Sequence, residues 1–235
     1  WFGHHLGDYL KFDDHVFGFI PGKSHIDAAA VHVNAKWVYS VDIKDFFSTT
    51  PSEIVIEKLV ELGYSQKAAE LIVPLCCYKK HLAQGAPSSP ILSNLVMQDI
   101  DVKLNSLADE YNVRFSRYAD DIVFSSQKDG EYIQGDLIDI PEGLKLRVKS
   151  LFENSCWKLS SQKEYSACLP QRLKVHGLMV QGEKPILTKG YRNKIRAFEH
   201  MIKQGKVNND SDIKRIKGHI HYSKSVDGYN KTSES

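Results

Sequence analysis

Residues 113–126 read Val113-Arg-Phe-Ser-Arg-Tyr-Ala-Asp-Asp-Ile-Val-Phe-Ser-Ser126. Two runs rich in β-branched and aromatic side chains flank the pair Asp120 and Asp121, and this pattern predicts two strands joined by a tight turn. An Asp side chain can hydrogen-bond its own backbone, so an acid pair alone is an ordinary feature of hairpin turns. In this chain two apolar strands would fix both acids in place, which makes them candidates for a functional site.

A third acid ends another predicted strand, Trp37-Val-Tyr-Ser-Val-Asp42. Strands of one sheet can bring Asp42 and Asp120 together although 78 residues separate them in the chain. Converging carboxylates repel each other, and a divalent cation relieves the repulsion. Mg²⁺ prefers oxygen ligands and often keeps coordination places for water and phosphate. Two such ions ~3.5–4 Å apart can bind and stabilise both the attacking and the leaving oxygen in a phosphoryl transfer.

The rest of the chain predicts a mixture of helices and short strands. Thr50 as N-cap, Pro51 as first helical residue and Glu53 as capping partner predict a helix that ends at Gly63. A loop over residues 84–90 precedes a long helix with apolar residues near helical spacing. Further helices are expected at about 66–77, 142–155 and 191–204, and strands at 156–160, 174–180 and 185–188.

The composition is typical of a globular core, with 42% hydrophobic and 26% charged residues. No apolar run approaches the ~18 residues that a membrane span needs, so no membrane association is expected. Four Cys fit neither a disulfide framework nor a zinc site, and a reducing cytoplasmic compartment is the expectation.

The net charge of +2 hides an uneven distribution. Residues 189–224 carry ten Lys or Arg against three acids, a net charge of +7, whereas the first 188 residues carry −4. A basic segment of this kind can bind phosphate backbones. The simpler alternative is a solvated helix face.

Five segments resemble the sequence motifs of reverse transcriptases, and they occur in that family's order over residues 17–180. Phe115–Phe124 resembles motif C, the Tyr-x-Asp-Asp box. The other four are Tyr39-Ser-Val-Asp-Ile-Lys-Asp-Phe-Phe47 (motif A), Gln84-Gly-Ala-Pro-Ser-Ser-Pro-Ile-Leu-Ser-Asn94 (motif B), Ser161-Gln-Lys163 (motif D) and Val175-His-Gly-Leu178 (motif E). The resemblance is to the bacterial retron, group II intron and defence-associated enzymes. Ala28-Ala-Ala-Val-His32 keeps half of a retron element, Asn-Ala-x-x-His.

This resemblance implies an α+β, right-hand polymerase fold. It implies a palm with an antiparallel sheet and helices, partial fingers and a helical thumb. The expected domains are partial fingers at 1–36, a palm at 37–188 with fingers elements around 51–90, a thumb at 189–224 and a disordered tail at 225–235.

The resemblance also implies an RNA-directed DNA polymerase that extends a primer with dNTPs and makes retron-type or antiphage-defence cDNA. Two Mg²⁺ ions, with Mn²⁺ as a substitute, would be held by Asp42, the Ile43 backbone, Asp120 and Asp121, and Lys163 would give a proton to the departing pyrophosphate. The implied partners are a template RNA (including a dedicated non-coding RNA), its cDNA, and an effector protein or a second copy of the chain. The alternatives are a catalytically silent RNA-binding scaffold of a defence complex and an RNA-dependent RNA polymerase.

Further residues receive binding roles from the same motifs. Phe47 falls at the family's sugar-gate position, where an aromatic ring would clash with a ribose 2′-OH; core packing is the alternative and suits Phe46 better. Arg114 and Arg117 flank motif C without an implied role, and a solvent-exposed position is the simple interpretation. The implied nucleotide-binding residues are Ile43, Lys44, Asp45, Phe46, Phe47, Gln84 and Gly85. Those for nucleic acid are Tyr118, Arg192, Lys194, Arg196, Lys203, Lys214, Arg215 and Lys217.

Overall fold

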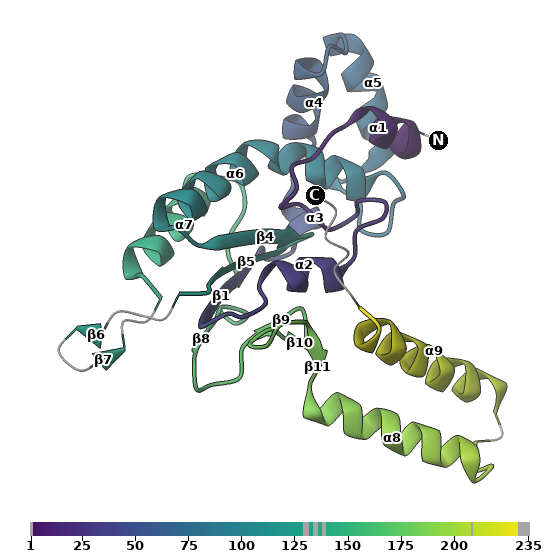
Figure 1. Cartoon of the computed structure of the whole chain (residues 1–235). Helices are drawn as coiled ribbons and strands as arrows, with labels where there is room; N and C mark the ends of the chain where they lie inside the picture. The colour runs from purple at the N-terminus through teal and green to yellow at the C-terminus, as the bar shows by residue number, and fades with distance from the viewer. Residues whose placement is uncertain (1, 129–131, 134–135, 138–139, 208, 230–235) are drawn as a thin grey trace.

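A four-stranded antiparallel sheet forms the centre of the molecule (Figure 1). The structure is a computed structural model that describes the chain except for residues 1, 129–131, 134–135, 138–139, 208 and 230–235. The strand order is β4-β5-β1-β8. The strands span Arg114–Tyr118 (β4), Asp121–Ser126 (β5), Trp37–Asp42 (β1) and Tyr165–Cys168 (β8).

The register of β1 against β5 runs from Trp37 opposite Ser126 to Asp42 opposite Asp121. Successive side chains of a strand point to opposite faces, so the sheet sorts its residues into two layers. Tyr39 and Val41 lie in one layer, and Val38 lies in the other. The strand predicted at 37–42 is confirmed as β1. The two strands predicted on either side of the Asp120 turn are confirmed as β4 and β5, which pair with each other.

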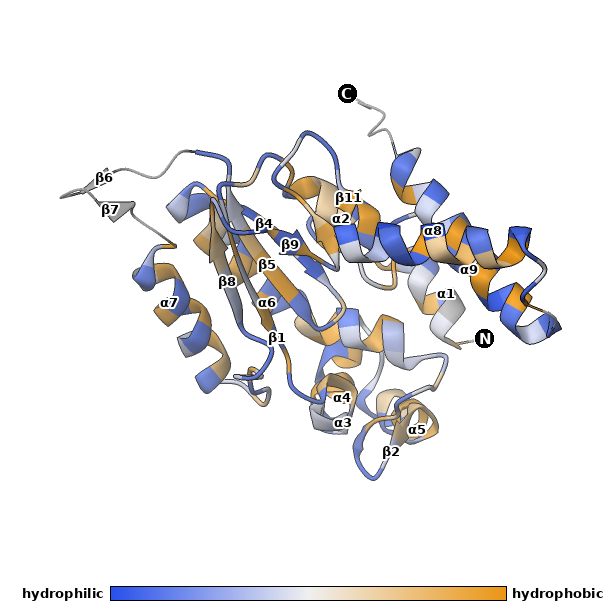
Figure 2. Ribbon diagram, turned by 90° about the horizontal axis from the view of Figure 1, so that it is seen from below, coloured by the Kyte–Doolittle hydropathy of each residue, from blue (hydrophilic) through white to orange (hydrophobic). Residues whose placement is uncertain are grey.

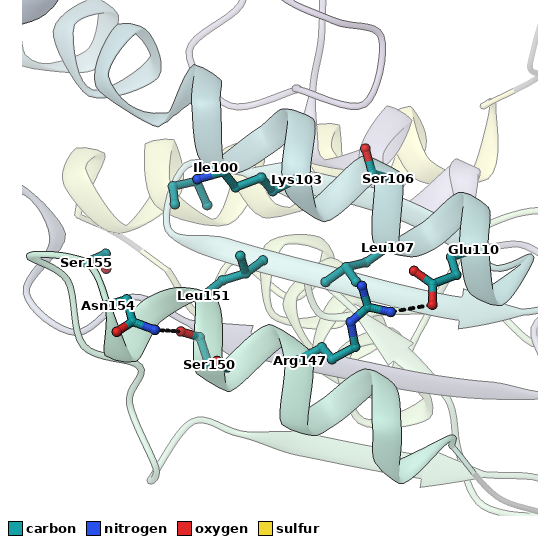
Figure 3. Close-up of a pocket in the computed structure, with 10 residues that line it drawn as sticks. All are labelled: Ile100, Lys103, Ser106, Leu107, Glu110, Arg147, Ser150, Leu151, Asn154 and Ser155. Atoms are coloured by element: carbon teal, nitrogen blue, oxygen red, sulfur yellow. Dashed lines mark hydrogen bonds and ion pairs between the residues drawn. The ribbon is translucent and has the colours of Figure 1, made fainter.

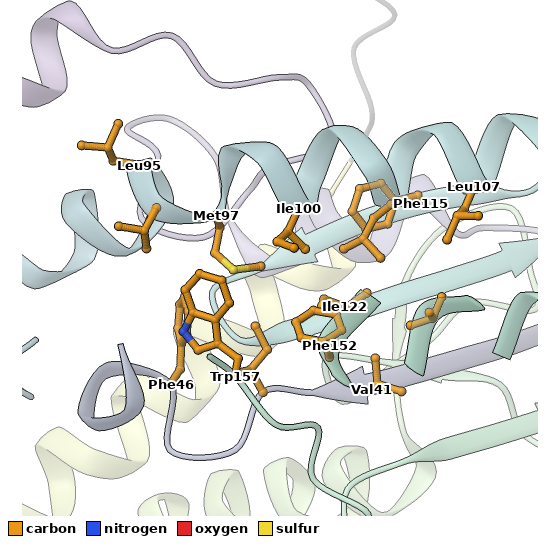
Figure 4. Packing of buried hydrophobic residues seen from close by; sticks show 14 of the residues in the cluster. Val41, Phe46, Leu95, Met97, Ile100, Leu107, Phe115, Ile122, Phe152 and Trp157 are labelled. Carbon is orange, nitrogen blue, oxygen red and sulfur yellow. The ribbon is translucent and has the colours of Figure 1, made fainter. Parts of the chain in front are cut away.

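Two helices cover the first face of the sheet. They are α6 (Ser89–Tyr111) and α7 (Glu142–Glu153), and their apolar residues form the large core with the strands (Figure 4). Leu104, Phe124 and Phe152 in this core are almost fully buried. The long helix α6 ends at Asn112, whose left-handed backbone (φ 52°) is a common helix termination. This face anchors the sheet but carries none of the predicted acids.

The second face packs against α2 (His25–Val31) and a small antiparallel sheet. Ser24 caps α2, because its side chain accepts from Asp27 N while Asp27 accepts from Ser24 N at 2.7 Å. Val38 and Val123 of the central sheet are buried here. The strands of the small sheet are β9 (Lys174–Val175), β10 (Leu178–Met179) and β11 (Ile186–Leu187).

A group of short elements projects beyond one end of the central sheet (Figure 1). Thr50 does not cap helix α4 (Ser52–Glu61), contrary to the sequence prediction. Pro51 occupies the N-cap position and makes no side-chain capping hydrogen bond. Thr50 is instead fully buried, donates to Phe46 O at 2.7 Å and accepts from Trp157 Nε1 at 2.9 Å. The elements are α1 (Phe2–Tyr9), α3 (Phe46–Thr49), α4 (Ser52–Glu61), α5 (Gln66–Cys76), β2 (Cys77–Tyr78) and β3 (His81–Leu82).

The basic segment forms two helices, α8 (Lys189–Lys203) and α9 (Asp210–Asp227). Both mix hydrophilic and hydrophobic residues along their length (Figure 2). The predicted disorder from residue 225 is wrong up to Tyr229, because α9 continues to Asp227, Val226 is fully buried and Tyr229 hydrogen-bonds Asp27. Residues 230–235 of the predicted tail lie outside the described residues.

The C-terminal end of α9 docks on α2. Tyr222 Oη lies 2.9 Å from His25 Nε2, and Tyr229 donates a hydrogen bond to Asp27 Oδ1 at 2.9 Å. One further sequence expectation, a strand at 156–160, is wrong. Residues 156–160 contain an isolated bridge at Leu159 instead of a strand. The hairpin strands β6 (Tyr132–Ile133) and β7 (Asp136–Leu137) lie before α7.

His32 joins α2 to the central sheet. The imidazole is fully buried, with Nδ1 2.7 Å from Ser125 Oγ and Nε2 2.7 Å from Ser116 Oγ. Burial lowers the pKa of His32 from 6.5 to about 3. The folded chain therefore keeps this ring neutral at pH values where the unfolded chain protonates it.

We expect this difference to destabilise the fold in acid. Between pH 6.5 and about 3 the unfolded chain binds one more proton at His32, so the free energy of unfolding falls by about 1.4 kcal/mol per pH unit as the pH decreases. Urea unfolding at pH 6, 5 and 4 measures the slope. His32→Gln retains the other histidines, so its slope should be smaller by this amount, and equal slopes would contradict the prediction.

Candidate active site

The three predicted acids lie together where β1 ends and β5 begins. The register places Asp42 directly opposite Asp121. The turn between β4 and β5 is tied to β1, because Ile43 N donates to Asp120 O at 3.0 Å. The antiparallel pairing thus brings together carboxylates that are far apart in the sequence.

Asp42 is the most buried of these acids, with a side chain that is 5% exposed. Burial raises the pKa of Asp42, and the charges of Asp120 and Asp121 raise it further, while Lys163 opposes them. The Lys163 ammonium donates to Asp42 Oδ2 at 2.8 Å, and this hydrogen bond raises the pKa of Lys163. The net effect on Asp42 shows that one lysine does not fully compensate for burial and two neighbouring acids.

The other carboxylate oxygen, Asp42 Oδ1, is buried and accepts no hydrogen bond from the described residues. Buried polar atoms usually have a partner, and an unsatisfied carboxylate oxygen is costly. Among the described residues, no three His, Cys, Asp or Glu side chains converge closely enough to hold a metal ion by themselves. Oxygen from two or three carboxylates and the Ile43 carbonyl nonetheless fits Mg²⁺, which completes its shell with water and phosphate.

His176 contacts the second acid of the pair. Its Nδ1 lies 3.5 Å from Asp121 Oδ2, and its side chain is only 6% exposed. The ring packs on Tyr118, with 5.3 Å between the ring centroids. The sequence identified Val175-His-Gly177 as part of a motif but assigned no role to its central residue. The sequence signal that could have identified it is the position of a His inside this motif. In the structure His176 lies at the tight turn between β9 and β10, with φ 48°.

The residues after Asp42 divide into exposed and core positions. Lys44 and Asp45 are exposed, and Asp45 has a left-handed backbone (φ 52°) before the short helix α3. Phe46 is buried in the core beside Trp157, with 6.1 Å between the rings. Phe47 is only partly buried, and its ring lies 6.0 Å from that of Phe19. Phe46 is therefore the core residue of the pair, as the sequence indicated.

Gln84 and Gly85 occupy an exposed turn before α6. Gly85 has φ 85°, a left-handed conformation that glycine adopts without strain. Ser89 Oγ closes the turn by donating to Ala83 O at 2.6 Å. Within the described part of the chain, no hydrogen bond or ion pair links Gln84 or Gly85 to the three acids.

The basic residues expected to contact nucleic acid are exposed on α8 and α9. Arg215 pairs with Asp212 at 3.1 Å. A cavity of 340 Å³ lies between α8 and the small sheet, and four cations are among its lining residues: Arg172, Lys189, Arg192 and Arg196. The exposed predicted residues are Arg192, Lys194, Arg196, Lys203, Lys214, Arg215 and Lys217.

The two arginines that flank the Asp-Asp turn differ. Arg114 is exposed and donates to Val31 O at 2.8 Å. Arg117 is fully buried, which contradicts the solvent-exposed position that the sequence suggested. The side chains that bind it, Asp101 and Asn94, lie on α6, so no pattern within β4 could identify them.

A larger cavity of 560 Å³ lies between α6 and α7, on the other face of the sheet (Figure 3). An ion pair between Arg147 and Glu110 crosses it. None of the three acids lines this cavity. The candidate site is thus the surface at the strand ends rather than this cavity.

Residues 4–184 match the reverse transcriptase (RNA-dependent DNA polymerase) family, and the chain belongs to that family. The expected class, an RNA-directed DNA polymerase, is confirmed. Such an enzyme copies an RNA template, and polymerases use divalent metal ions.

Several curated relatives are retron reverse transcriptases. The chain is 28% identical over 229 residues to the retron Ec86 reverse transcriptase of Escherichia coli, covering 97% of this chain and 67% of that protein. It is 23% identical to the retron Ec83 reverse transcriptase of the same organism over 233 residues, covering 94% and 72%. Identity to the retron Mx65 reverse transcriptase of Myxococcus xanthus is 34% over 126 residues, covering 46% and 30%.

The fold is also similar to that of Candida albicans telomerase, solved with a fragment of telomeric RNA. The TM-score is 0.53 at 10% identity, and the match covers 86% of this chain and 42% of the telomerase. This likeness confirms the right-hand polymerase fold. Across the described residues, no helix has the length and apolar character needed to span a bilayer.

Proposed function

We propose that this chain extends a primer with dNTPs on an RNA template, and that Asp42, Asp120 and Asp121 form its active site. The observation that carries the proposal is the buried, unpartnered Oδ1 of Asp42 beside the Asp120-Asp121 turn. Membership of the reverse transcriptase family supplies the class of reaction.

The residues proposed to hold two Mg²⁺ ions, or Mn²⁺ in their place, are Asp42, Asp120, Asp121 and the carbonyl of Ile43. When bound, the ions would activate the primer 3′-OH and stabilise the charge on the attacking and leaving oxygens. The sheet holds the carboxylates in fixed positions for this task. The hydrogen bond to Asp42 at 2.8 Å holds the Lys163 ammonium beside the carboxylates, and its side chain is 62% exposed. This ammonium is the proposed proton source for departing pyrophosphate.

The nucleotide would lie over the segment that follows Asp42. Lys44, Asp45 and the backbone around Phe46 form the floor for the triphosphate, and Gln84 and Gly85 contact the base or template from the neighbouring loop. Phe47 is the part of this segment whose ring is neither fully buried nor fully exposed, so it can meet the sugar.

Phe47→Val should reduce the preference for dNTPs over NTPs. A smaller side chain leaves room for the ribose 2′-OH, and steric discrimination of one hydroxyl is worth on the order of 100-fold. The measurement is the ratio of kcat/KM for dGTP and GTP on one primer and template. Tyr78→Val removes an exposed aromatic ring elsewhere and should leave the ratio unchanged. An unchanged ratio in Phe47→Val would remove Phe47 from the site.

The proposed domain division follows the same assignment. Residues 1–36 and the elements within 51–90 would be fingers, 37–188 the palm, and 189–224 the thumb. The thumb cations and Tyr118 would contact the primer and template, mainly at phosphates and without reading sequence. We further propose that the template is a dedicated non-coding RNA and that the product is retron-type or antiphage-defence cDNA. The relatives support this role because they are retron enzymes. The same proposal includes a protein partner that binds this chain, either an effector protein or a second copy of the chain.

Primer extension tests the function directly. The full chain is incubated with a labelled DNA primer on an RNA template, Mg²⁺ and either dNTPs or NTPs. Extension with dNTPs supports the proposal. Extension with NTPs alone would favour an RNA-dependent RNA polymerase. RNA binding without any extension, in folded protein, would favour a catalytically silent scaffold.

A further inference from the structure

Arg117 is a fully buried cation one residue before Tyr118. Its guanidinium has five N–H donors, and four hydrogen bonds to three groups are present. Nε and Nη2 donate to the two carboxylate oxygens of Asp101, both at 2.6 Å. Nη1 donates to Asn94 Oδ1 at 3.0 Å and to Ala119 O at 2.9 Å. Asp101 and Asn94 are themselves buried on α6.

The hydrogen bond from Arg117 to Ala119 O reaches the turn between β4 and β5 that carries Asp120, here called the catalytic turn. Ala119 O belongs to the residue immediately before Asp120. Ala119 has φ 57°, a left-handed conformation that is unfavourable for a residue with a Cβ. Such a conformation persists only where its surroundings fix it. The hydrogen bond from Arg117 is one of the contacts that do so.

The N-terminal segment completes the arrangement. Asn94 Nδ2 donates to Gly18 O at 2.8 Å, so one amide joins this segment to Arg117. Phe17 N donates to Arg117 O at 2.9 Å, and Arg117 N donates to His15 O at 2.8 Å. The turn is thus held between α6, β4 and residues 15–18.

We propose that Arg117, supported by Asn94 and Asp101, is a positioning residue that sets the place of Asp120 relative to Asp42. This inference rests on the proposed active site. Arg117 touches neither substrate nor metal in it; the guanidinium acts through the Ala119 carbonyl. A bidentate, planar fork is required because a lysine ammonium cannot bind both oxygens of Asp101 and reach Ala119 O and Asn94 as well.

Two variants test the proposal without leaving a lone buried charge. Asn94→Ala removes the bridge to Gly18 O and one contact of Arg117 but keeps the Arg117–Asp101 pair. Arg117→Lys keeps a cation beside Asp101 and loses the fork. Lys58→Met is the matched control. It breaks an ion pair with Asp99, an exposed residue of α6, the helix that also carries Asn94 and Asp101. Circular dichroism and the melting temperature show whether each variant is folded.

The first readout is binding of Mn²⁺ alone, followed by the electron paramagnetic resonance of the free ion. We expect Asn94→Ala and Arg117→Lys to weaken binding by roughly 10- to 100-fold, the usual effect of losing a group that orients metal ligands. The second readout is primer extension, in which kcat should fall while KM for the dNTP changes less than about two-fold. Lys58→Met should change neither quantity.

Folded variants with wild-type Mn²⁺ affinity would overturn the proposal, and so would an equal loss in Lys58→Met. If Arg117→Lys does not fold, the Mn²⁺ affinity and kcat of Asn94→Ala alone test the proposal. A wild-type chain that binds Mn²⁺ but extends no primer would contradict the proposed function, while the comparison of Mn²⁺ affinities would still judge the positioning role.

Discussion

Asp120→Asn should abolish primer extension while the protein stays folded. The substitution replaces a charged oxygen ligand by a neutral amide, and metal ions supply several kcal/mol of transition-state stabilisation in such reactions. The loss should therefore be at least about 1000-fold in kcat, since each 1.36 kcal/mol is tenfold in rate. The backbone bond between Ile43 N and Asp120 O does not depend on the side chain, so the turn should keep its place.

The measurement is extension of a labelled primer on RNA with dNTPs, together with RNA binding by a gel-shift assay. Asp109→Asn is the matched control, because Asp109 is an exposed acid on α6. It should retain activity. Full extension by folded Asp120→Asn would contradict the proposed active site, and loss of RNA binding would point to a different defect.

Gly18→Ala should reduce extension by about 100-fold. A Cβ at Gly18 would lie 2.1 Å from Ala119 N and 2.9 Å from Ala119 Cα, so the backbone of the catalytic turn must move. Misplacement of a reacting group by ~1 Å can cost about 100-fold in rate. The same collision should lower the free energy of unfolding, which denaturant titration measures.

Gly182→Ala is the control for this prediction. A Cβ at Gly182 meets no atom within 4 Å, and its backbone φ is not in the left-handed range. This variant should match the wild type in both stability and extension. If Gly18→Ala does the same, the close approach of residue 18 to the turn is not important for activity.

The sequence predicted three of the four strands of the central sheet, β1, β4 and β5, and the acids at their ends, because both depend on local patterns; β8 (Tyr165–Cys168) was not predicted. A run of β-branched and aromatic residues indicates a strand wherever it pairs, and motif spacing identified Asp42 and Asp120. The core position expected for Phe46 is also confirmed. These features need no knowledge of distant partners.

The sequence could not predict features that depend on such partners. Arg117 is buried because Asp101 and Asn94 on α6 surround its charge. Thr50 satisfies its hydroxyl with Trp157, 107 residues away, instead of capping a helix. The chain is ordered as far as Tyr229 because Tyr222 and Tyr229 contact His25 and Asp27 of α2 and Val226 is buried against the sheet.

The strand order β4-β5-β1-β8 has a consequence for how the chain folds during synthesis. β1 is made before the other three strands of its sheet, yet it occupies an interior position with a neighbour on each side. Both of its edges stay unpaired until β5 and then β8 leave the ribosome, the latter at residues 165–168. Pairing between segments so distant in sequence is slow, and an exposed apolar edge invites association with other chains. Nascent chains that end before β8 should therefore be the species most prone to aggregate.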